Sequence, residues 1–132
     1  MLSLYIDGAS RGNPGQSSCA FIIEKNGKIV EEKSQYLGIK TNNQAEYMAL
    51  LMVLERVIEM NELNVQIFSD SELLVKQING FYQVKSENLR PLFQKYLELK
   101  QKLTNIEIYH ISRERNKLAD KLCNQELNMS FL

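Results

Sequence analysis

The chain begins with the stretch Leu2-Ser3-Leu4-Tyr5-Ile6-Asp7-Gly8, an apolar run that ends on an acid followed by a glycine. Successive side chains of a strand point to opposite faces, which gives two sets: Leu2, Leu4 and Ile6 on one face, Ser3, Tyr5 and Asp7 on the other. Such a run is typical of a buried strand, where an unpaired carboxylate costs several kcal/mol. The acid at its end therefore needs a specific partner.

Three further acids share this placement, where an expected strand or helix meets a loop: Glu46 in Thr41-Asn42-Asn43-Gln44-Ala45-Glu46, Asp70 after Ile67-Phe68-Ser69, and Asp120 in Asn116-Lys117-Leu118-Ala119-Asp120. A divalent cation can neutralise a cluster of buried acids, and hard carboxylate oxygens suit Mg²⁺ or Mn²⁺. Together with Asp7, these acids predict a site for metal-dependent phosphoryl chemistry.

The apolar pattern predicts the order of the elements. Strands are expected over residues 2–7, 18–25, 28–36, 65–69 and 106–111. Helices are expected from an N-cap at Thr41 to about Met60, and over residues 71–78, 88–103 and 117–127. Asn26-Gly27 is a strong hairpin signal between the second and third strands. Residues 8–15, rich in Gly and Asn, predict a loop with exposed backbone N–H groups.

This order predicts an α/β fold. We expect a mixed five-stranded sheet, three antiparallel strands followed by parallel ones, flanked by helices on both faces. No repeat or linker interrupts the pattern, so residues 1–132 are expected to form a single domain. Gln66, Phe68 and Asp70 share one face of the fourth strand, so adjacent central strands can bring Asp7 and Asp70 side by side at one sheet edge.

Amino-acid composition indicates the cellular compartment but not the binding partner. Lys plus Arg and Asp plus Glu number 16 each, so no strong overall field points to a nucleic acid. Cys19 and Cys123 lack a metal-ligand spacing and are expected to be buried free thiols in a reducing cytosol. No leader pattern opens the chain, and no apolar run approaches the roughly 20 residues that span a bilayer. We expect a cytoplasmic monomer without a membrane partner.

Four segments together resemble the signature segments of type 1 ribonuclease H, in the family's order and over nearly the whole chain: residues 7–15, residues 41–46, Ser69-Asp70-Ser71 and residues 116–120. The short connection over residues 111–116 is similar to that of the compact archaeal and bacterial branch. The resemblance implies a ribonuclease H-like fold and endonucleolytic hydrolysis of the RNA strand in an RNA–DNA hybrid.

The resemblance also implies how the acids are used. Asp7, Glu46, Asp70 and Asp120 correspond to the family's catalytic, metal-binding carboxylates, which hold two Mg²⁺ or Mn²⁺ ions. Two such ions clamp the scissile phosphate, one activating water and the other stabilising the leaving 3′ oxygen. Asp7 is expected to be shared by both ions, and the products to carry 5′-phosphate and 3′-hydroxyl ends.

A second group of residues is expected to contact the substrate: Gly8, Ser10, Gly12, Asn13, Thr41, Asn42, Asn43 and Gln44. Their amides and neutral side chains suit a test for the RNA 2′-hydroxyl, which both donates and accepts hydrogen bonds. The resemblance assigns Gly12, Asn13, Asn42, Asn43 and Gln44 to the RNA strand and Thr41 to a DNA phosphate. Thr41 and its neighbours could instead serve only as a helix cap.

The chain departs from the larger relatives at three places. An Arg common two residues before Thr41 is Ile39 here, and residues 81–88 leave no room for the basic helix that helps to grip the hybrid. Weak binding at physiological salt is expected to follow. His110 falls at the loop His of the larger relatives in a gapless alignment, but strand alignment places it inside the last strand. Arg113 then becomes the cation near the metals.

Three functions fit these observations to different degrees. The leading hypothesis is an active ribonuclease H. A hybrid-binding or partner-binding module with weak or no turnover is favoured slightly by the neutral charge and the missing basic helix, whereas the four intact acids argue against it. Separately, Tyr82, Lys85 and Arg90 could form a modest DNA-strand track. The third is another nuclease of the same fold that cleaves DNA, for which groups suited to the 2′-hydroxyl would have no use.

Overall fold

The computed structural model describes residues 1–130 and follows the predicted order of elements. The strands are β1 (Leu2–Gly12), β2 (Gly15–Lys25), β3 (Lys28–Lys40), β4 (Asn64–Ser69) and β5 (Asn105–His110). The helices are α1 (Asn42–Glu59), α2 (Glu72–Ile78), α3 (Arg90–Lys100) and α4 (Lys117–Met129), with a short 3₁₀ turn η1 (Arg113–Asn116) before α4.

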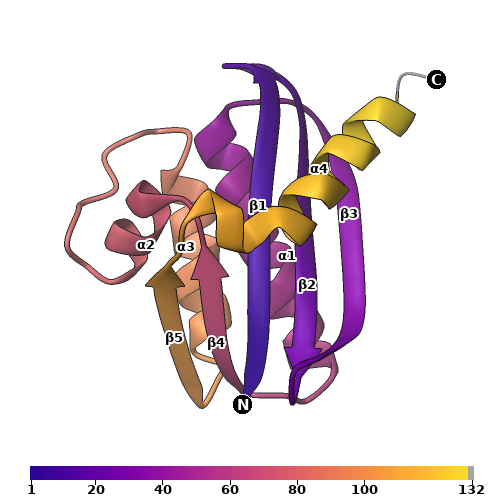
Figure 1. The fold of residues 1–132 in the computed structure, drawn as a ribbon. Helices are drawn as coiled ribbons and strands as arrows, with labels where there is room; N and C mark the ends of the chain where they lie inside the picture. Colours follow the sequence, from indigo (N-terminus) through magenta and orange to yellow (C-terminus); the bar gives the residue numbers. More distant parts are fainter. Residues whose placement is uncertain (131–132) are drawn as a thin grey trace.

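The strands form one mixed sheet in the order β3-β2-β1-β4-β5 (Figure 1). β2 pairs with β1 and β3 in antiparallel fashion, whereas β4 runs parallel to both β1 and β5. α1 and α3 lie behind the sheet in Figure 1, and α4 crosses the front over β1, β2 and β3. The predicted five-stranded α/β architecture is confirmed.

The first hairpin is longer than the sequence pattern predicts. β1 and β2 stay paired from Gly8 opposite Cys19 to Gly12 opposite Gly15, so the expectation of a loop over residues 8–15 was wrong. Gly8 is needed for close packing, because a Cβ there would lie 2.3 Å from the carbonyl carbon of Ala45 in α1. A glycine that permits close approach of a helix looks, in sequence, like one that permits a turn.

The second hairpin turn and the cap of α1 behave as predicted. Asn26 and Gly27 both adopt positive φ, 53° and 78°, as a two-residue hairpin requires. Thr41 is the N-cap of α1, and its side chain accepts from the Gln44 N–H at 3.1 Å while Gln44 Oε1 accepts from the Thr41 N–H at 2.8 Å. This capping box fixes where α1 begins.

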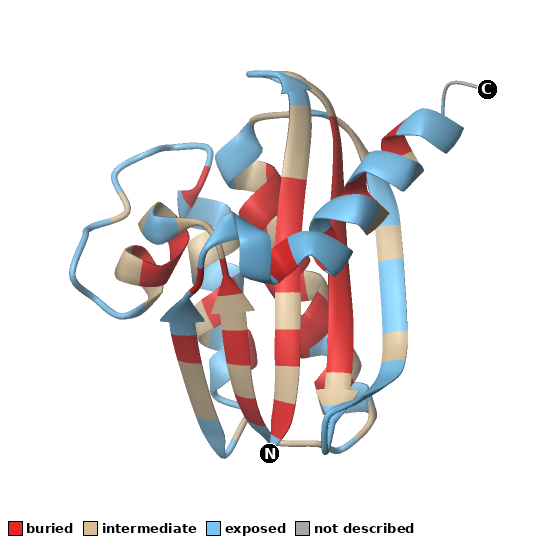
Figure 2. Ribbon diagram, in the orientation of Figure 1, coloured by how far each residue is buried: buried red, intermediate tan, exposed pale blue. Residues whose placement is uncertain are grey.

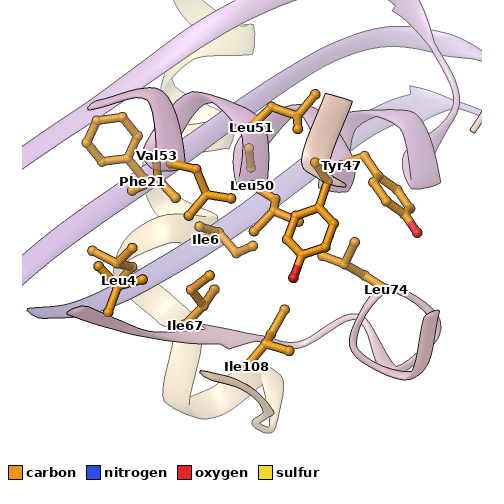
Figure 3. Packing of buried hydrophobic residues seen from close by; sticks show 14 of the residues in the cluster. Leu4, Ile6, Phe21, Tyr47, Leu50, Leu51, Val53, Ile67, Leu74 and Ile108 are labelled. Atoms are coloured by element: carbon orange, nitrogen blue, oxygen red, sulfur yellow. The ribbon is translucent and has the colours of Figure 1, made fainter. Parts of the chain in front are cut away.

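The main core lies between the sheet and α1. Figure 3 shows Leu4, Ile6 and Ile67 of the sheet facing Leu50 and Val53 of α1, and burial is concentrated in the central strands in Figure 2. Cys19 and Cys123 are free and buried, as predicted. Within residues 1–130, no helix has the length and apolar character that crossing a membrane requires.

Candidate active site

The site lies where β4 ends beside a longer β1. Ser69, the last residue of β4, pairs with Ile6, whereas β1 continues to Gly12. Beyond this point, the edge of β1 that faced β4 has no strand neighbour. Alternate residues of a strand direct their backbone N–H and C=O groups toward the same edge of the strand. The carbonyl of Ile6 and the N–H of Gly8 both bond side chains there instead of a strand. The gap lets acids from both faces of the sheet approach β1.

Three carboxylates meet in this gap. Asp7, Glu46 and Asp70 each offer one oxygen within 4.8 Å of the others, although they come from β1, α1 and the end of β4. Asp7 and Glu46 are each only 4% exposed. The Gly8 N–H donates to Asp7 Oδ1 at 3.0 Å and to Glu46 Oε2 at 3.2 Å, which orients both acids.

Burial and mutual repulsion make this group unfavourable when it is fully ionised. Burial first, and then the charges of Asp70 and Asp120, raise the pKa of Asp7 to about 8. The pKa of Glu46 is also raised, by burial and by the charges of Asp7 and Asp70. No cationic side chain is among the groups that shift the pKa values of Asp7 and Glu46. A hard divalent cation fits such a group of carboxylates, because it would stabilise their ionised forms.

Asp120 stands at the edge of the group. It is exposed in the first turn of α4 and is not among the acids that lie within 4.8 Å of one another. Its charge nevertheless contributes to the raised pKa of Asp7. Asn124, one turn further along α4, donates from Nδ2 to the Asp120 backbone oxygen at 3.1 Å. All four predicted acids therefore lie at the same end of the sheet, three of them tightly grouped.

Asn116 links the elements of the site, although no pattern in the sequence assigned it a separate role. Its Nδ2 donates to Ile6 O at 2.8 Å and to Asp70 Oδ2 at 3.2 Å, and the residue is 2% exposed. The available signal was its position four residues before Asp120 in the 116–120 segment.

The predicted substrate-contact residues surround the N-terminus of α1, with one exception. Asn13 Oδ1 accepts from the Asn42 N–H at 3.1 Å, and the Ser10 hydroxyl donates to Lys40 O at 3.0 Å. Asn42 and Asn43 are exposed. Thr41 and Gln44 form the capping box described above, while Gly12 has a φ of 115° at the hairpin end. Gly8, by contrast, is buried and its N–H bonds the acids, so the expected surface contact does not fit its position.

The structure separates the two candidate basic groups. His110 ends β5 and is exposed, which confirms its expected place inside the last strand. Arg113 begins η1 and is also exposed. Within residues 1–130 the Arg113 guanidinium forms no hydrogen bond or ion pair. Arg113 and Asn116 are the first and last residues of η1.

A hollow beside the α1 N-terminus extends the site. It has a volume of about 370 Å³, and its walls include Asn13, Thr41, Asn43, Gln77 and Lys85. A neighbouring hollow of about 530 Å³ shares Gln77, Gln83 and Lys85 with it and adds Tyr82 and Arg90, two side chains of the expected DNA-strand track.

Gln77 lines both hollows and forms hydrogen bonds to a core residue and to another residue of the walls. Gln77 was not identified from the sequence. It is 5% exposed, accepts from the buried Tyr47 hydroxyl at 2.6 Å, and donates to Gln83 O at 3.4 Å. A polar residue on the short helix α2 gives no sequence signal of this burial, because its partner Tyr47 lies 30 residues away.

Comparison with known proteins agrees with this geometry. The model of the reverse transcriptase-like family matches residues 5–126. Ribonuclease HI of Halobacterium salinarum is 36% identical over 94% of this chain, and the chain spans 63% of that protein's length. Ribonuclease H of Prosthecochloris aestuarii is 32% identical, with 94% of this chain and 93% of that protein covered.

The fold comparison is equally close. The crystal structure of LC11-RNase H1 in complex with an RNA/DNA hybrid superposes with a TM-score of 0.96 at 35% identity, and the match covers 100% of both chains. No helix lies between α2 and α3 within the described residues, so the basic protrusion of the larger relatives is absent. The chain therefore belongs to the reverse transcriptase-like family and, within it, to the compact ribonuclease H1 proteins.

Proposed function

We propose that this protein is an endonuclease that hydrolyses the RNA strand of RNA–DNA hybrids. The observation that supports the proposal most directly is the group of Asp7, Glu46 and Asp70, with carboxylate oxygens within 4.8 Å of one another. It occurs in a chain that matches LC11-RNase H1, a protein solved with an RNA/DNA hybrid, over its full length. The proposal includes cleavage that leaves 5′-phosphate and 3′-hydroxyl ends.

The four acids would hold two Mg²⁺ or Mn²⁺ ions, with Asp7 shared between them. Such ions, when bound, supply an activated water and neutralise the charge on the leaving oxygen. The part of the protein itself is positional: β1 and β4 fix Asp7 and Asp70, and the Gly8 N–H orients Asp7 and Glu46. Carboxylates alone repel phosphate, so substrate and cations should bind cooperatively.

Choice of the RNA strand rests on neutral groups next to the acids. Asn13, Asn42 and Asn43 are exposed beside the N-terminus of α1, where amide donors and acceptors suit a 2′-hydroxyl. Thr41 lines the adjacent hollow and would meet a DNA phosphate there, with Lys85 on the same wall. The unoccupied guanidinium of Arg113 would contact substrate phosphate as a planar fork.

A hybrid-binding module with weak turnover is the second candidate. The cationic side chains that line the two hollows are Lys85 and Arg90, and the chain has no net formal charge. Few phosphate contacts predict weak binding with a shallow salt dependence, but they do not remove the acids required for cleavage.

A cleavage assay decides between these candidates. Purified protein is incubated with RNA–DNA hybrid, double-stranded RNA or double-stranded DNA, each labelled on one strand, with Mg²⁺, Mn²⁺ or EDTA. Metal-dependent internal cuts confined to the hybrid RNA, with 3′ fragments that ligase joins without prior phosphorylation, are expected. Binding without cutting supports the module, and cleavage of DNA would contradict both.

The setting of this activity is also a proposal. The two buried free thiols suit a reducing compartment, and we infer a single ribonuclease H domain that acts as a cytoplasmic monomer. Light scattering during size-exclusion chromatography should give the mass of one chain, 15.3 kDa, and a dimer mass would contradict the proposal.

A further inference from the structure

Asn116 occupies the position before α4 but does not cap it. Asn is among the best N-cap residues because its side-chain oxygen accepts from the first free N–H groups of a helix. Here the Asn116 side chain makes no capping hydrogen bond. It turns instead toward the end of β4 and the middle of β1, where Nδ2 bonds Ile6 O and Asp70 Oδ2.

The orientation of the Asn116 amide follows from its partners. Ile6 O is a carbonyl and Asp70 Oδ2 is a carboxylate oxygen, so only the NH₂ group of Asn116 can face them. This orientation leaves Asn116 Oδ1 as the one buried side-chain polar atom without a hydrogen-bond partner in residues 1–130. The direction of the amide is therefore set by Ile6 O and Asp70 Oδ2.

The two bonds join the elements that hold the acids. Ile6 precedes Asp7 in β1, Asp70 follows β4, and Asn116 immediately precedes α4, the helix that holds Asp120. Beyond Ser69 no strand pairing fixes the distance between β1 and the chain at Asp70. The amide of Asn116 spans this gap and holds one Asp70 oxygen, which leaves Asp70 Oδ1 for a cation.

We propose that Asn116 is a positioning residue that sets the spacing of Asp7 and Asp70 and so determines the affinity of the site for divalent cations. The inference rests on the proposed function for its catalytic consequence, but its geometric claim concerns cation binding alone. Groups that orient metal ligands typically contribute 10–100-fold to metal affinity or activity, and an amide that fixes one ligand oxygen belongs to this class.

The test compares Asn116→Ala with a matched control, Asn79→Ala. Asn79 also donates from its side-chain amide to a strand carbonyl, Ile108 O at 3.4 Å, but it contacts no acid of the site. For each variant the melting temperature is measured against Mn²⁺ concentration and compared with that variant's own metal-free value. This readout depends on cation binding and not on the starting stability.

We expect Asn116→Ala to raise the half-saturating Mn²⁺ concentration about tenfold or more. In cleavage assays kcat should fall at least about tenfold while KM for the hybrid stays within about twofold. Asn79→Ala should leave both the Mn²⁺ midpoint and kcat at the wild-type values. An Asn116→Ala protein with a lower metal-free melting temperature but a wild-type Mn²⁺ midpoint would overturn the proposal.

Two further arms keep the outcome interpretable. If Asn116→Ala does not fold, Asn116→Ser is used, because its hydroxyl retains a small polar group but is too short to bridge both acceptors. In an Asp70→Asn background, Asn116→Ala should cause no additional loss of Mn²⁺ binding, and a full additional loss would contradict the proposal. Wild-type protein that binds Mn²⁺ but does not cleave hybrid would refute the proposed function, and the Mn²⁺ midpoints would still decide the role of Asn116.

Discussion

The acid end of the sheet and the segment between α2 and α3 differ in how firmly the fold holds them. Asp7 and Glu46 are each 4% exposed and share the Gly8 N–H, and an Asn116 amide fixes Asp70. In the segment between α2 and α3, by contrast, residues 85–88 are exposed. Within residues 1–130, the one side chain of another element that forms a hydrogen bond to residues 83–88 is Gln77, which donates to Gln83 O. The fold thus prepares the chemical centre in advance and leaves the neighbouring wall able to adjust to a substrate.

The rigid side of this comparison has a cost that can be measured. Acids with raised pKa values oppose folding at neutral pH unless a cation neutralises them. Residues 85–88, in the adjustable wall between α2 and α3, carry no comparable cost in folding free energy, because they are exposed to solvent. Variants that remove the repulsion, or the hydrogen bond from Gln77 to Gln83 in the adjustable wall, should therefore affect different measured quantities.

The largest expected effect is that of Asp7→Asn. Cleavage of the hybrid should fall at least about 1000-fold, because several kcal/mol of charge stabilisation depend on the ligand set. The metal-free melting temperature should stay equal or rise, since the change removes repulsion with Glu46 and Asp70. Glu55→Gln, an exposed charge removal on the same helix as Glu46, is the control and should leave turnover unchanged. Near-normal turnover of Asp7→Asn would end the assignment of Asp7 as a shared ligand.

The pH dependence of metal-free stability tests the same rigidity. Burial and nearby charge raise the pKa of Asp7 from 3.8 to about 8, so the folded state binds this proton more tightly than the unfolded state. The associated stability is complete below pH 4 and is lost as the pH rises toward 8. Between pH 5 and pH 8 the advantage of Asp7→Asn over wild type should grow by about 1–3 kcal/mol in chemical denaturation.

Added Mn²⁺ should reduce this advantage at pH 8, because bound cations stabilise the ionised acids of the wild-type protein more than those of the variant. A difference between wild type and Asp7→Asn that stays constant from pH 5 to pH 8 would show that folding does not raise the pKa of Asp7.

The sequence predicted the rigid side of the comparison better than the adjustable one. Asp7 and Asp70 were identifiable because each follows an apolar strand, and Thr41 because a polar cap precedes an apolar stripe. These signals are local in the chain. Strand alternation indicated that Asp7 and Asp70 could meet if their strands were adjacent, and the structure shows that β1 and β4 are neighbours.

The features that the sequence did not predict depend on contacts between distant segments. Gly8 belongs to a strand because α1 packs against its backbone, and no local pattern distinguishes that from a turn glycine. Gln77 is buried because Tyr47 supplies a donor from another helix. The side-chain direction of Asn116, away from the cap and toward Asp70, depends on where β4 ends.

The tie between the core and the adjustable wall can be cut without disturbing the acids. Tyr47→Phe leaves the buried Oε1 of Gln77 unpaired and should cost about 1–3 kcal/mol of stability. Gln77→Leu should release Gln83 as well and raise KM for the hybrid about threefold to tenfold, with kcat nearly unchanged.

The double variant Tyr47→Phe/Gln77→Leu separates the two effects. With both polar partners replaced by apolar groups, the melting temperature should recover toward wild type, while the raised KM should persist because Gln83 remains untied. Recovery of KM together with the melting temperature would show that the tie to Gln83 has no part in substrate binding.

The smallest expected effect is that of Lys85→Ala, which leaves both the acids and the Gln77 tie intact. Lys85 lines both hollows, so the proposed function gives it one phosphate contact. Its loss should weaken hybrid binding about twofold to fivefold at moderate salt and reduce the slope of log affinity against log salt concentration by about 1. Lys102→Ala, an exposed charge removal just before β5 at the opposite end of the sheet, should change neither quantity. An unchanged salt slope for Lys85→Ala would place the DNA strand elsewhere and leave the adjustable wall without a proposed ligand.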